Sequence, residues 1–509
     1  MTQEKSTSSV EKLATGVEGF DQVAKGGLPK GRTTLVSGTA GSGKTVLAAQ
    51  FLAEGIQKAE ESGVFVTFEE SASDIRRNIA SLGWDVLRWE REGRWRFVDA
   101  SPQIDKEAIV TGAYDLGALM ARIEYAVREI DATRVALDSL GAVFSRFDNP
   151  SLIRTELLRI ASVLKRMGVT ALMTAERNRD YGNITRYGIE EFVADNVIVL
   201  RNVLEEGKRR RTLEILKFRG TGHNKGEYPF TITPGGGIVV IPLSSLELRQ
   251  RSSNVRITSG NAELDAMCDG GFFRDSIILV SGATGTGKTL MCTEFIAGGV
   301  NQGERTLLFA FEESREQLFR NAIGWGRDFE KMEQEGLLKV VCEYPEVAGL
   351  EDHLLKMRSI IETYKPNRVA VDSLSALERI STVKGFREFV IGLTSFIKHQ
   401  EIAGLFTSTT PTLLGGTSVT ETHISTITDS IILLRYVEMH GEMRRGITVL
   451  KMRGSMHDKE IREFTIDDKG MHIGLPFRNV AGILAGNPMH VDSTEIERLR
   501  NMFTEGQDS

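Results

Sequence analysis

The sequence predicts an α/β fold in which two tandem domains are each built on a parallel sheet with helices on both faces. Three observations support this prediction. The 509 residues exceed what one hydrophobic core usually serves, so at least two domains are expected. Several segments occur twice, in the same order. Within each copy, short β-branched runs such as "TTLVSG" alternate with longer helical patterns, which is typical of a parallel sheet covered on both faces.

The duplication sets the domain organisation. The repeated segments are "LVSGTAGSGKT" (35–45) and "LVSGATGTGKT" (279–289), "FVTFEES" (65–71) and "LFAFEES" (308–314), "RVALDSL" (134–140) and "RVAVDSL" (368–374), and "LKFRGTGHNKGEYPFTI" (216–232) and "LKMRGSMHDKEIREFTI" (450–466). Copies of this length suit complete globular domains rather than solenoid repeats. We therefore predict domains at 1–247 and 248–485, followed by a tail at 486–509. The polar, serine-rich junction 242–260 is expected to be a flexible linker.

Composition narrows the class of protein. Lys and Arg number 63 against 69 Asp and Glu, and the net charge of −6 argues against binding to a nucleic-acid backbone. Cys268, Cys292 and Cys342 show no disulfide or zinc-site spacing, so we expect reduced thiols in the core. The start lacks a signal-peptide pattern, and no apolar run reaches the ~18 residues of a membrane span. A cytoplasmic protein without a membrane or nucleic-acid partner is expected.

Both copies contain the phosphate-binding pattern GxxxxGK[ST] between an expected strand and an expected helix, the context that this motif requires. Its glycines let backbone N–H groups point at phosphate oxygens, and the helix that follows adds the positive end of its dipole. The lysines would neutralise the β- and γ-phosphates of ATP, and the threonine hydroxyls would bind Mg²⁺. The residues expected at these two loops are Gly38, Gly41, Ser42, Gly43, Lys44 and Thr45, and Gly282, Thr284, Gly285, Thr286, Gly287, Lys288 and Thr289.

Acidic residues follow other apolar runs in each copy. Asp138 and Asp372 end "RVALD" and "RVAVD", as a Walker B carboxylate must if it is to reach the metal ion. The pairs Glu69–Glu70 and Glu312–Glu313 come just after another strand, where a carboxylate can orient water or accept a proton in line with the γ-phosphate. The alternative is that these glutamates only stabilise a helix N-terminus.

Two pairs of cations lie late in each copy. Lys217 and Arg219, like Lys451 and Arg453, are two residues apart in strand-like sequence, so each pair is expected on one face of a strand. Such a pair could be a solvated strand edge. It could also be a clamp on a nucleotide held by a neighbouring subunit, in the manner of an arginine finger.

Taken together, these features resemble the KaiC family, the double-domain ATPases of the cyanobacterial-type circadian clock, within the RecA/DnaB-like superfamily. The resemblance extends from about residue 10 to residue 500. The most specific segments are the duplicated "FEES", "RGTGHNKGEYPFTI", "SLSALER" (373–379), "HISTITD" (423–429) and "KMRGSMHDK" (451–459).

The resemblance implies two RecA-like P-loop NTPase domains and a homohexamer of two stacked rings with ATP between adjacent subunits. It implies a slow ATPase in the N-terminal ring and an autokinase and autophosphatase in the C-terminal ring. It also implies that KaiB binds the first ring and that KaiA engages the tail. The residue roles implied are water activation by Glu69 and Glu70, contacts to a neighbour's nucleotide by Lys217, Arg219, His223, Lys451 and Arg453, nucleotide binding by Trp325, a general base and metal ligand at Glu312 with Glu313 beside it, and positions near the phosphorylation site at Arg379 and Thr420.

The second copy alone has adjacent hydroxyl residues, Ser425 and Thr426, where the first copy has Glu191 and Phe192. Phosphoryl transfer depends mostly on positioning and charge, so the nucleophile that sits in line receives the phosphoryl group. Water then gives an ATPase, and a fixed hydroxyl gives a kinase. The resemblance marks both residues as phosphorylation sites, although Ser and Thr also commonly satisfy local backbone hydrogen bonds.

The tail and two rival functions remain open. Helical spacing in "VDSTEIERLRNMF" (491–503) predicts a short amphipathic helix, either a partner's ligand or self-packing. A DNA-driven motor would share the same loops, but the sequence has no basic loop with interleaved aromatic residues. A scaffold that binds ATP only to assemble would not need the lysines and four glutamates.

Overall fold

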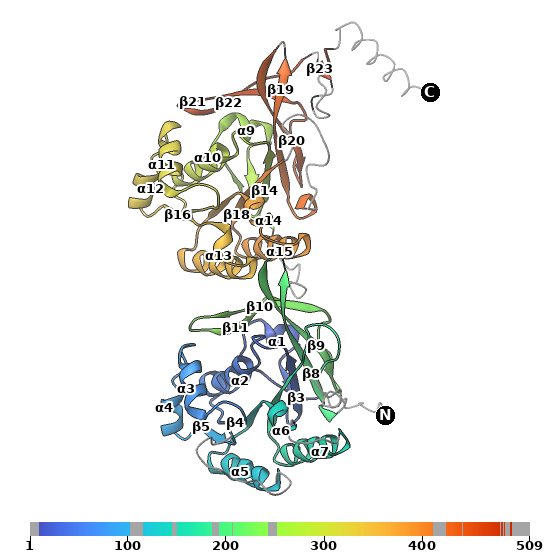
Figure 1. Ribbon diagram of the computed structural model, residues 1–509. Coiled ribbons are helices and arrows are strands. Elements are labelled where there is room, and N and C mark those ends of the chain that lie inside the picture. The colour runs from blue at the N-terminus through green and yellow to red at the C-terminus, as the bar shows by residue number, and fades with distance from the viewer. Residues whose placement is uncertain are drawn as a thin grey trace, which may run out of the picture. The chain divides into compact units, whose positions relative to one another are not determined.

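The computed structural model describes residues 10–101, 116–144, 150–185, 193–205, 207–242, 252–410, 424–439, 441–478, 480–481, 483 and 489–490. The chain divides into two compact units, Met1–Leu246 and Glu247–Ser509. Each is an α/β domain with one large sheet (Figure 1). The two-domain α/β prediction is confirmed.

The first domain has a nine-stranded sheet in the order β11-β10-β9-β8-β3-β7-β6-β4-β5. Six strands from β8 to β5 are parallel, and β9 to β11 extend the sheet in antiparallel fashion. The strands are β3 (Thr33–Gly38), β4 (Gly63–Thr67), β5 (Trp95–Asp99), β6 (Arg134–Asp138), β7 (Thr170–Glu176), β8 (Asn196–Glu205), β9 (Lys208–Phe218), β10 (Glu227–Thr233) and β11 (Gly237–Val240). The antiparallel extension was not predicted.

Helices cover both faces of this sheet, as predicted. They are α1 (Phe20–Val23), α2 (Lys44–Ala59), α3 (Ala72–Ala80), α4 (Val86–Arg91), α5 (Leu116–Glu129), α6 (Leu140–Phe144) and α7 (Pro150–Arg166), and β1 (Lys12–Leu13) pairs with β2 (Leu28–Pro29) outside the sheet. Ala136 of β6 packs in one core cluster with Phe51 of α2, whereas its neighbours Val135 and Leu137 pack with Ile123 of α5 on the other face. Successive strand residues point to opposite faces, so β6 is buried on both sides.

The second domain repeats this architecture in the order β16-β15-β17-β18-β14-β19-β20-β21-β22. Its strands are β14 (Ile277–Gly282), β15 (Thr306–Ala310), β16 (Leu338–Cys342), β17 (Arg368–Asp372), β18 (Ala403–Thr409), β19 (Ser430–Met439), β20 (Glu442–Met452), β21 (Arg462–Asp467) and β22 (Gly470–Pro476). Its helices are α9 (Ala262–Met267), α10 (Lys288–Val300), α11 (Arg315–Gly324), α12 (Phe329–Gln334), α13 (Leu350–Tyr364), α14 (Leu374–Glu378) and α15 (Val383–His399).

One part of the predicted linker 242–260 is wrong. Arg256–Ile257 form strand β12, which pairs with β13 (Phe272–Phe273) of the second domain, and Ile257 belongs to that domain's core. The serine-rich composition that suggested a linker therefore applies only to the earlier part of the segment. The tail helix expected at 491–503 lies outside the described residues.

A buried arginine joins helix and sheet at the same place in both domains. Arg134 and Arg368, the first residues of β6 and β17, are 2% and 0% exposed. Their guanidinium groups bind the acidic side chains of Glu61 and Glu304 and donate to carbonyl oxygens in α2 and α10, respectively. A buried charge is tolerated when it is paired and hydrogen-bonded in this way. These contacts hold the helix that follows each phosphate-binding loop against the strand that ends in the Walker B aspartate.

Candidate functional site

The two phosphate-binding loops have the backbone that their glycines predict. Gly43 and Gly287 lie just before α2 and α10 with φ of 92° and 106°, in the left-handed region that favours glycine. Neither helix N-terminus has a side-chain cap, so its first N–H groups are available to an anion. A Cβ on Gly285 would lie 2.8 Å from the Tyr436 hydroxyl. The loop therefore has no room for a side chain there.

The loop lysines lie in matching positions. Lys44 Nζ donates to the carbonyl oxygens of Gly38 and Thr39, and Lys288 Nζ donates to those of Gly282 and Ala283, all four at 3.0 Å. Burial lowers the pKa of Lys44 and Lys288. Carboxylates oppose this effect: Glu176, Asp138 and Glu69 for Lys44, in that order, and Asp372 and Glu312 for Lys288. The carbonyl dipoles of the loop and the nearby carboxylates thus hold each ammonium group at its loop.

The Walker B aspartates end neighbouring strands beside these loops. Asp138 accepts a hydrogen bond from Thr174 of β7, and Asp372 accepts one from Thr407 of β18. Asp372 also accepts a hydrogen bond from Thr289 Oγ1 at 2.7 Å. Burial raises the pKa of Asp372, and the donated hydrogen bonds oppose that rise.

The second domain therefore presents a hydroxyl and a carboxylate together. Mg²⁺ in phosphate-binding sites keeps several water ligands and takes only a few oxygens from the protein. This hydroxyl and carboxylate are such a set of ligands. Among the described residues, no group of three or more His, Cys, Asp or Glu side chains is arranged to hold a metal ion by itself.

Each catalytic glutamate candidate has a partner that recurs in both domains. Ser139 Oγ donates to Glu69 Oε1 at 2.9 Å, and Ser373 Oγ donates to Glu312 Oε2 at 3.1 Å. The second glutamate of each pair binds an asparagine eight residues later: Asn78 Nδ2 to Glu70 and Asn321 Nδ2 to Glu313, both at 3.1 Å.

The hydrogen-bonded cap of the helix that follows each glutamate pair is a serine. Ser71 caps α3 and Ser314 caps α11, each accepting a hydrogen bond from a backbone N–H of the first turn. The glutamates are therefore not the capping groups. Sequence reasoning missed Asn78 and Asn321, although each lies eight residues after the second glutamate in both copies, and that recurrence was a usable signal.

Glu312 has one further contact. Arg379 Nη2 lies 3.0 Å from Glu312 Oε1, so one carboxylate oxygen is paired with Ser373 and the other with Arg379. The repeated segment has a serine in place of this arginine, Ser145, which lies outside the described residues. The two domains thus differ at this contact in sequence.

The late cations lie away from their own phosphate-binding loop. Sheet pairing aligns Lys217 with Val197 and Val197 with Leu35, three residues before Gly38 along β3. Three residues of a strand span about 10 Å, so Lys217 is near the amino end of the parallel strands and the loop is at the carboxyl end. Lys451 has the same relation to Gly282, through Ile431 and Leu279.

These cations contact the segment that leads into the neighbouring strand, β8 or β19. Lys217 Nζ donates to Ala194 O at 2.9 Å, and Arg219 Nη1 lies 3.6 Å from Asp195 Oδ1. In the second domain, Lys451 Nζ donates to Thr428 O at 2.6 Å, and Arg453 Nη2 donates to Thr426 O at 2.8 Å. Arg219 and Arg453 are half exposed, at 51% and 53% of their side chains.

Four other predicted residues are placed as follows. His223 lies in the turn after β9, its ring 5.4 Å from that of Phe218, and burial lowers its pKa. Trp325 follows α11 and packs, half-buried, against the core of the second domain. Thr426 ends a short 3₁₀ helix, Ile424–Thr426, and is exposed. Ser425 lies within that helix.

Three further residues named from the sequence, Glu191, Phe192 and Thr420, lie outside the described residues.

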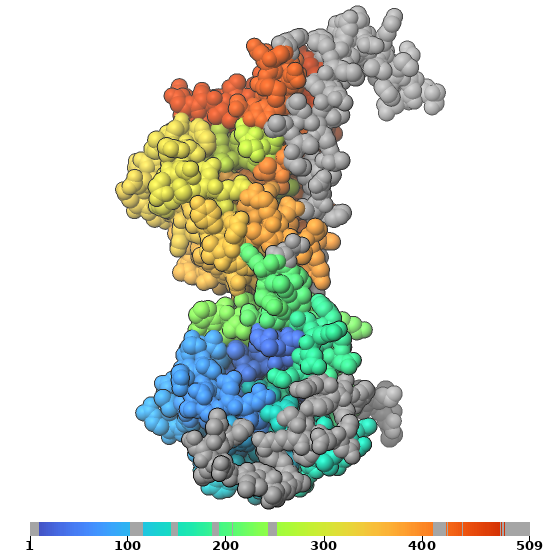
Figure 2. Space-filling model, viewed as in Figure 1, coloured from blue at the N-terminus to red at the C-terminus, as the bar shows by residue number. Residues whose placement is uncertain are grey.

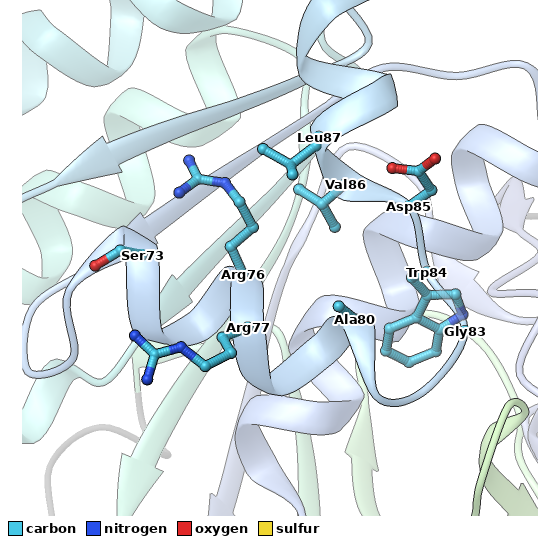
Figure 3. A pocket seen from close by; sticks show the side chains of 9 residues that line it. All are labelled: Ser73, Arg76, Arg77, Ala80, Gly83, Trp84, Asp85, Val86 and Leu87. Carbon is cyan, nitrogen blue, oxygen red and sulfur yellow. The ribbon is translucent and has the colours of Figure 1, made fainter.

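A pocket of about 500 Å³ lies between α3 and α4 of the first domain (Figure 3), in the part of the chain that is blue in Figure 2. Arg76 and Trp84 are among the side chains that line it. Arg76 is paired with Glu90 through two hydrogen bonds of 2.8 Å. None of the predicted site residues lines this pocket.

The fold and these sites together define a tandem P-loop ATPase of the RecA-like class. A family model described as "ATPase: KaiC" matches residues 13–245 and 257–476. The chain belongs to this KaiC ATPase family, so the predicted resemblance is confirmed. Because the family is an ATPase family, nucleotide binding is also confirmed. No helix among the described residues is long and apolar enough to span a membrane.

Named relatives resemble the chain over almost its full length. The "Circadian clock protein KaiC3" of Synechocystis sp. is 68% identical over 499 residues, covering 98% of this chain and 99% of the relative. The "Circadian clock oscillator protein KaiC" of Thermostichus vulcanus is 56% identical over 499 residues, covering 97% and 96%. The protein of the same name in Synechococcus elongatus is 54% identical over 505 residues, covering 98% and 97%.

Proposed function

We propose that this chain is a circadian clock ATPase of the cytoplasm that hydrolyses ATP in residues 1–247 and phosphorylates itself in residues 248–485. The acceptors are Ser425 and Thr426, and the second domain also removes the phosphate again. Phosphorylation state then controls binding of KaiB to the first domain and of KaiA to the tail at 486–509.

One observation carries the proposal: the same apparatus occurs twice, and only the second copy has adjacent hydroxyls, at Ser425 and Thr426, where the first copy has Glu191 and Phe192. The loop lysine, the aspartate, both glutamates and both glutamate partners recur with matching contacts. Thr426 is exposed, and its carbonyl oxygen is held by Arg453. Two sites that share these groups and act on different nucleophiles can run hydrolysis in one domain and self-phosphorylation in the other.

The chemistry of each site follows from the placed groups. The loop N–H groups and the lysine bind the phosphates of ATP, and Thr45 with Asp138 or Thr289 with Asp372 would hold Mg²⁺. Mg²⁺ would neutralise charge on the β- and γ-phosphates. Glu69 or Glu312 accepts the proton of the attacking nucleophile. The next residue, Glu70 or Glu313, adds negative charge near that proton.

The position of the late cations supports a ring in which ATP is bound between subunits. Lys217, Arg219, Lys451 and Arg453 lie about 10 Å or more along the sheet from their own phosphate-binding loops. Half-exposed guanidinium groups at this edge suit a nucleotide bound by an adjacent copy. A homohexamer with such trans contacts, including His223, accounts for both features.

Phosphosite mapping after incubation with Mg·ATP tests the proposal. We expect phosphate on Ser425 and Thr426 and none in the first domain. Lys288→Ala should abolish this modification, whereas its matched counterpart Lys44→Ala should abolish most ATP hydrolysis and leave the second domain's phosphate-binding loop intact. Wild-type protein that carries phosphate on neither residue would refute the kinase assignment. Size-exclusion chromatography with and without ATP tests the hexamer separately.

A further inference from the structure

The first domain has a carboxylate at its nucleotide site that the second domain lacks. Glu176 is the last residue of β7, and parallel pairing places it opposite Gly38, the first glycine of the phosphate-binding loop. At the same level in the second domain, Thr409 ends β18 opposite Gly282. A position that is equivalent in the sheet therefore carries a carboxylate in one domain and a hydroxyl in the other.

Glu176 lies beside the residues that hold the general base. A Cβ built on Gly141 would lie 3.6 Å from both Glu176 Cγ and Ser139 Oγ, and Ser139 is the donor to Glu69. Thr174, two residues before Glu176 on the same face of β7, donates to Asp138. Glu176 thus lies near Ser139 and Thr174, the hydroxyl residues that donate to Glu69 and Asp138.

The carboxylate of Glu176 is available for a ligand. In the part of the chain that the structure describes, no hydrogen-bond donor contacts it, although its charge acts on Lys44. In the second domain, Ser375 replaces Gly141, and its hydroxyl accepts a hydrogen bond from the backbone N–H of Thr409 at 2.8 Å. The Ser375 hydroxyl and the Thr409 backbone there bind each other.

The number of acceptors matches the nucleophile. Water has two O–H groups, so orienting one lone pair at phosphorus requires two hydrogen-bond acceptors. Glu69, just after β4, and Glu176, at the end of β7, provide two in the first domain, while Glu70 is engaged by Asn78. A serine or threonine hydroxyl has one O–H group and is already held by its own chain, so one acceptor is enough. Glu312 supplies that acceptor in the second domain.

We propose that Glu176 positions the attacking water in the first domain, and that Thr409 at the equivalent place leaves the second domain suited to a protein hydroxyl. This inference rests on the proposed division between hydrolysis and self-phosphorylation. In the hydrolytic step the water oxygen bonds to the γ-phosphorus, and the bond from that phosphorus to the bridging oxygen breaks. Its electron pair leaves with ADP. One water proton passes to Glu69 and then to solvent, while the other remains hydrogen-bonded to Glu176.

Steady-state hydrolysis tests this role in full-length protein carrying Glu312→Gln and Glu313→Gln, which silence transfer in the second domain and leave its phosphate-binding loop unchanged. In that background, Glu176→Thr should lower kcat on the order of 10- to 100-fold, with KM changed less than about threefold. Glu176→Gln keeps a carbonyl acceptor and should lose less. Glu18→Thr, at an exposed position of the first domain, is the matched control and should leave both constants unchanged.

If Glu176 only offsets the positive charge of Lys44, the kinetic result should differ. Removing such a charge would lower KM and leave kcat unchanged, and that outcome would overturn the inference alone. A background protein that hydrolyses no ATP would overturn the assignment of hydrolysis to the first domain, and the inference with it. The reciprocal change, Thr409→Glu in a Glu69→Gln, Glu70→Gln background, should raise the ratio of released phosphate to protein-bound phosphate. Thermal unfolding of each variant shows whether a loss of rate comes from misfolding.

Discussion

Replacing the asparagine that holds the second glutamate should slow each domain's reaction separately. Asn321→Ala removes the donor 3.1 Å from Glu313 Oε2, and Asn78→Ala removes the corresponding donor to Glu70. A hydrogen bond to a charged group contributes about 1.5–3 kcal/mol, and the lower end applies because Glu313 is only half-buried. Since about 1.4 kcal/mol corresponds to tenfold in rate, phosphate transfer should fall about tenfold in Asn321→Ala.

The same reasoning predicts a smaller effect in the first domain. Glu70 is exposed, so water replaces much of the lost hydrogen bond, and hydrolysis in Asn78→Ala should fall about two- to fivefold, near 0.5–1 kcal/mol. In the second domain, burial raises the pKa of Glu313 and the Asn321 hydrogen bond lowers it. Losing that bond therefore also favours the protonated form, which acts in the same direction as the lost positioning.

Each variant is measured in two assays, the time course of protein-bound phosphate and the release of inorganic phosphate at saturating Mg·ATP. Asn301→Ala, at an exposed asparagine in the second domain, serves as the matched control. If Asn321→Ala left phosphate transfer at the control rate, or slowed release by the first domain equally, the asparagine would be structural and the reasoning would be refuted.

Three further changes test other contacts. Gly285→Ala would place a Cβ 2.8 Å from the Tyr436 hydroxyl at φ +79°, so nucleotide affinity in the second domain should fall at least about tenfold in equilibrium binding. Glu304→Gln leaves Arg368, 0% exposed, without its charged partner, and should cost about 3–5 kcal/mol in denaturant unfolding of that domain. Burial raises the pKa of Glu294, so its contribution to stability is complete below the ordinary value of 4.5 and is lost as the pH rises through the raised value. Glu294→Gln removes this loss, so its unfolding midpoint relative to wild type should be higher at pH 7 than at pH 4.5.

Repetition explains why so much of the fold and site could be predicted. A single apolar run ending in aspartate is weak evidence, but Asp138 and Asp372 follow loops of the same pattern at the same place in both copies. Phosphate loops depend on local backbone geometry, which glycine spacing encodes directly. The parallel core was predictable for the same reason, because strands buried on both faces are continuously apolar.

The contacts that were not predicted depend on pairing between distant strands. The place of Lys217 near the amino end of the parallel strands follows from the register of β9 on β8, which has a bulge between Val197 and Ile198. A period-two pattern gives the face of a residue and not its level along the sheet. The proposed role of Glu176 depends likewise on strand alignment, because its place opposite Gly38 follows only from the pairing of β7 with β3.

Because the two sites share their lysine, aspartate and glutamates, the proposed difference in reaction has to come from residues that are not repeated. Arg453 shows how such a difference connects to assembly. Its Nη2 donates to the carbonyl oxygen of Thr426, and its Nη1 lies 3.9 Å from Asp429 Oδ1. The guanidinium group proposed to contact a neighbour's nucleotide therefore also holds the backbone of a proposed phosphate acceptor. Arrival of a nucleotide at Arg453 would compete for these bonds, so the acceptor's position and the occupancy of the adjacent site are linked through one side chain.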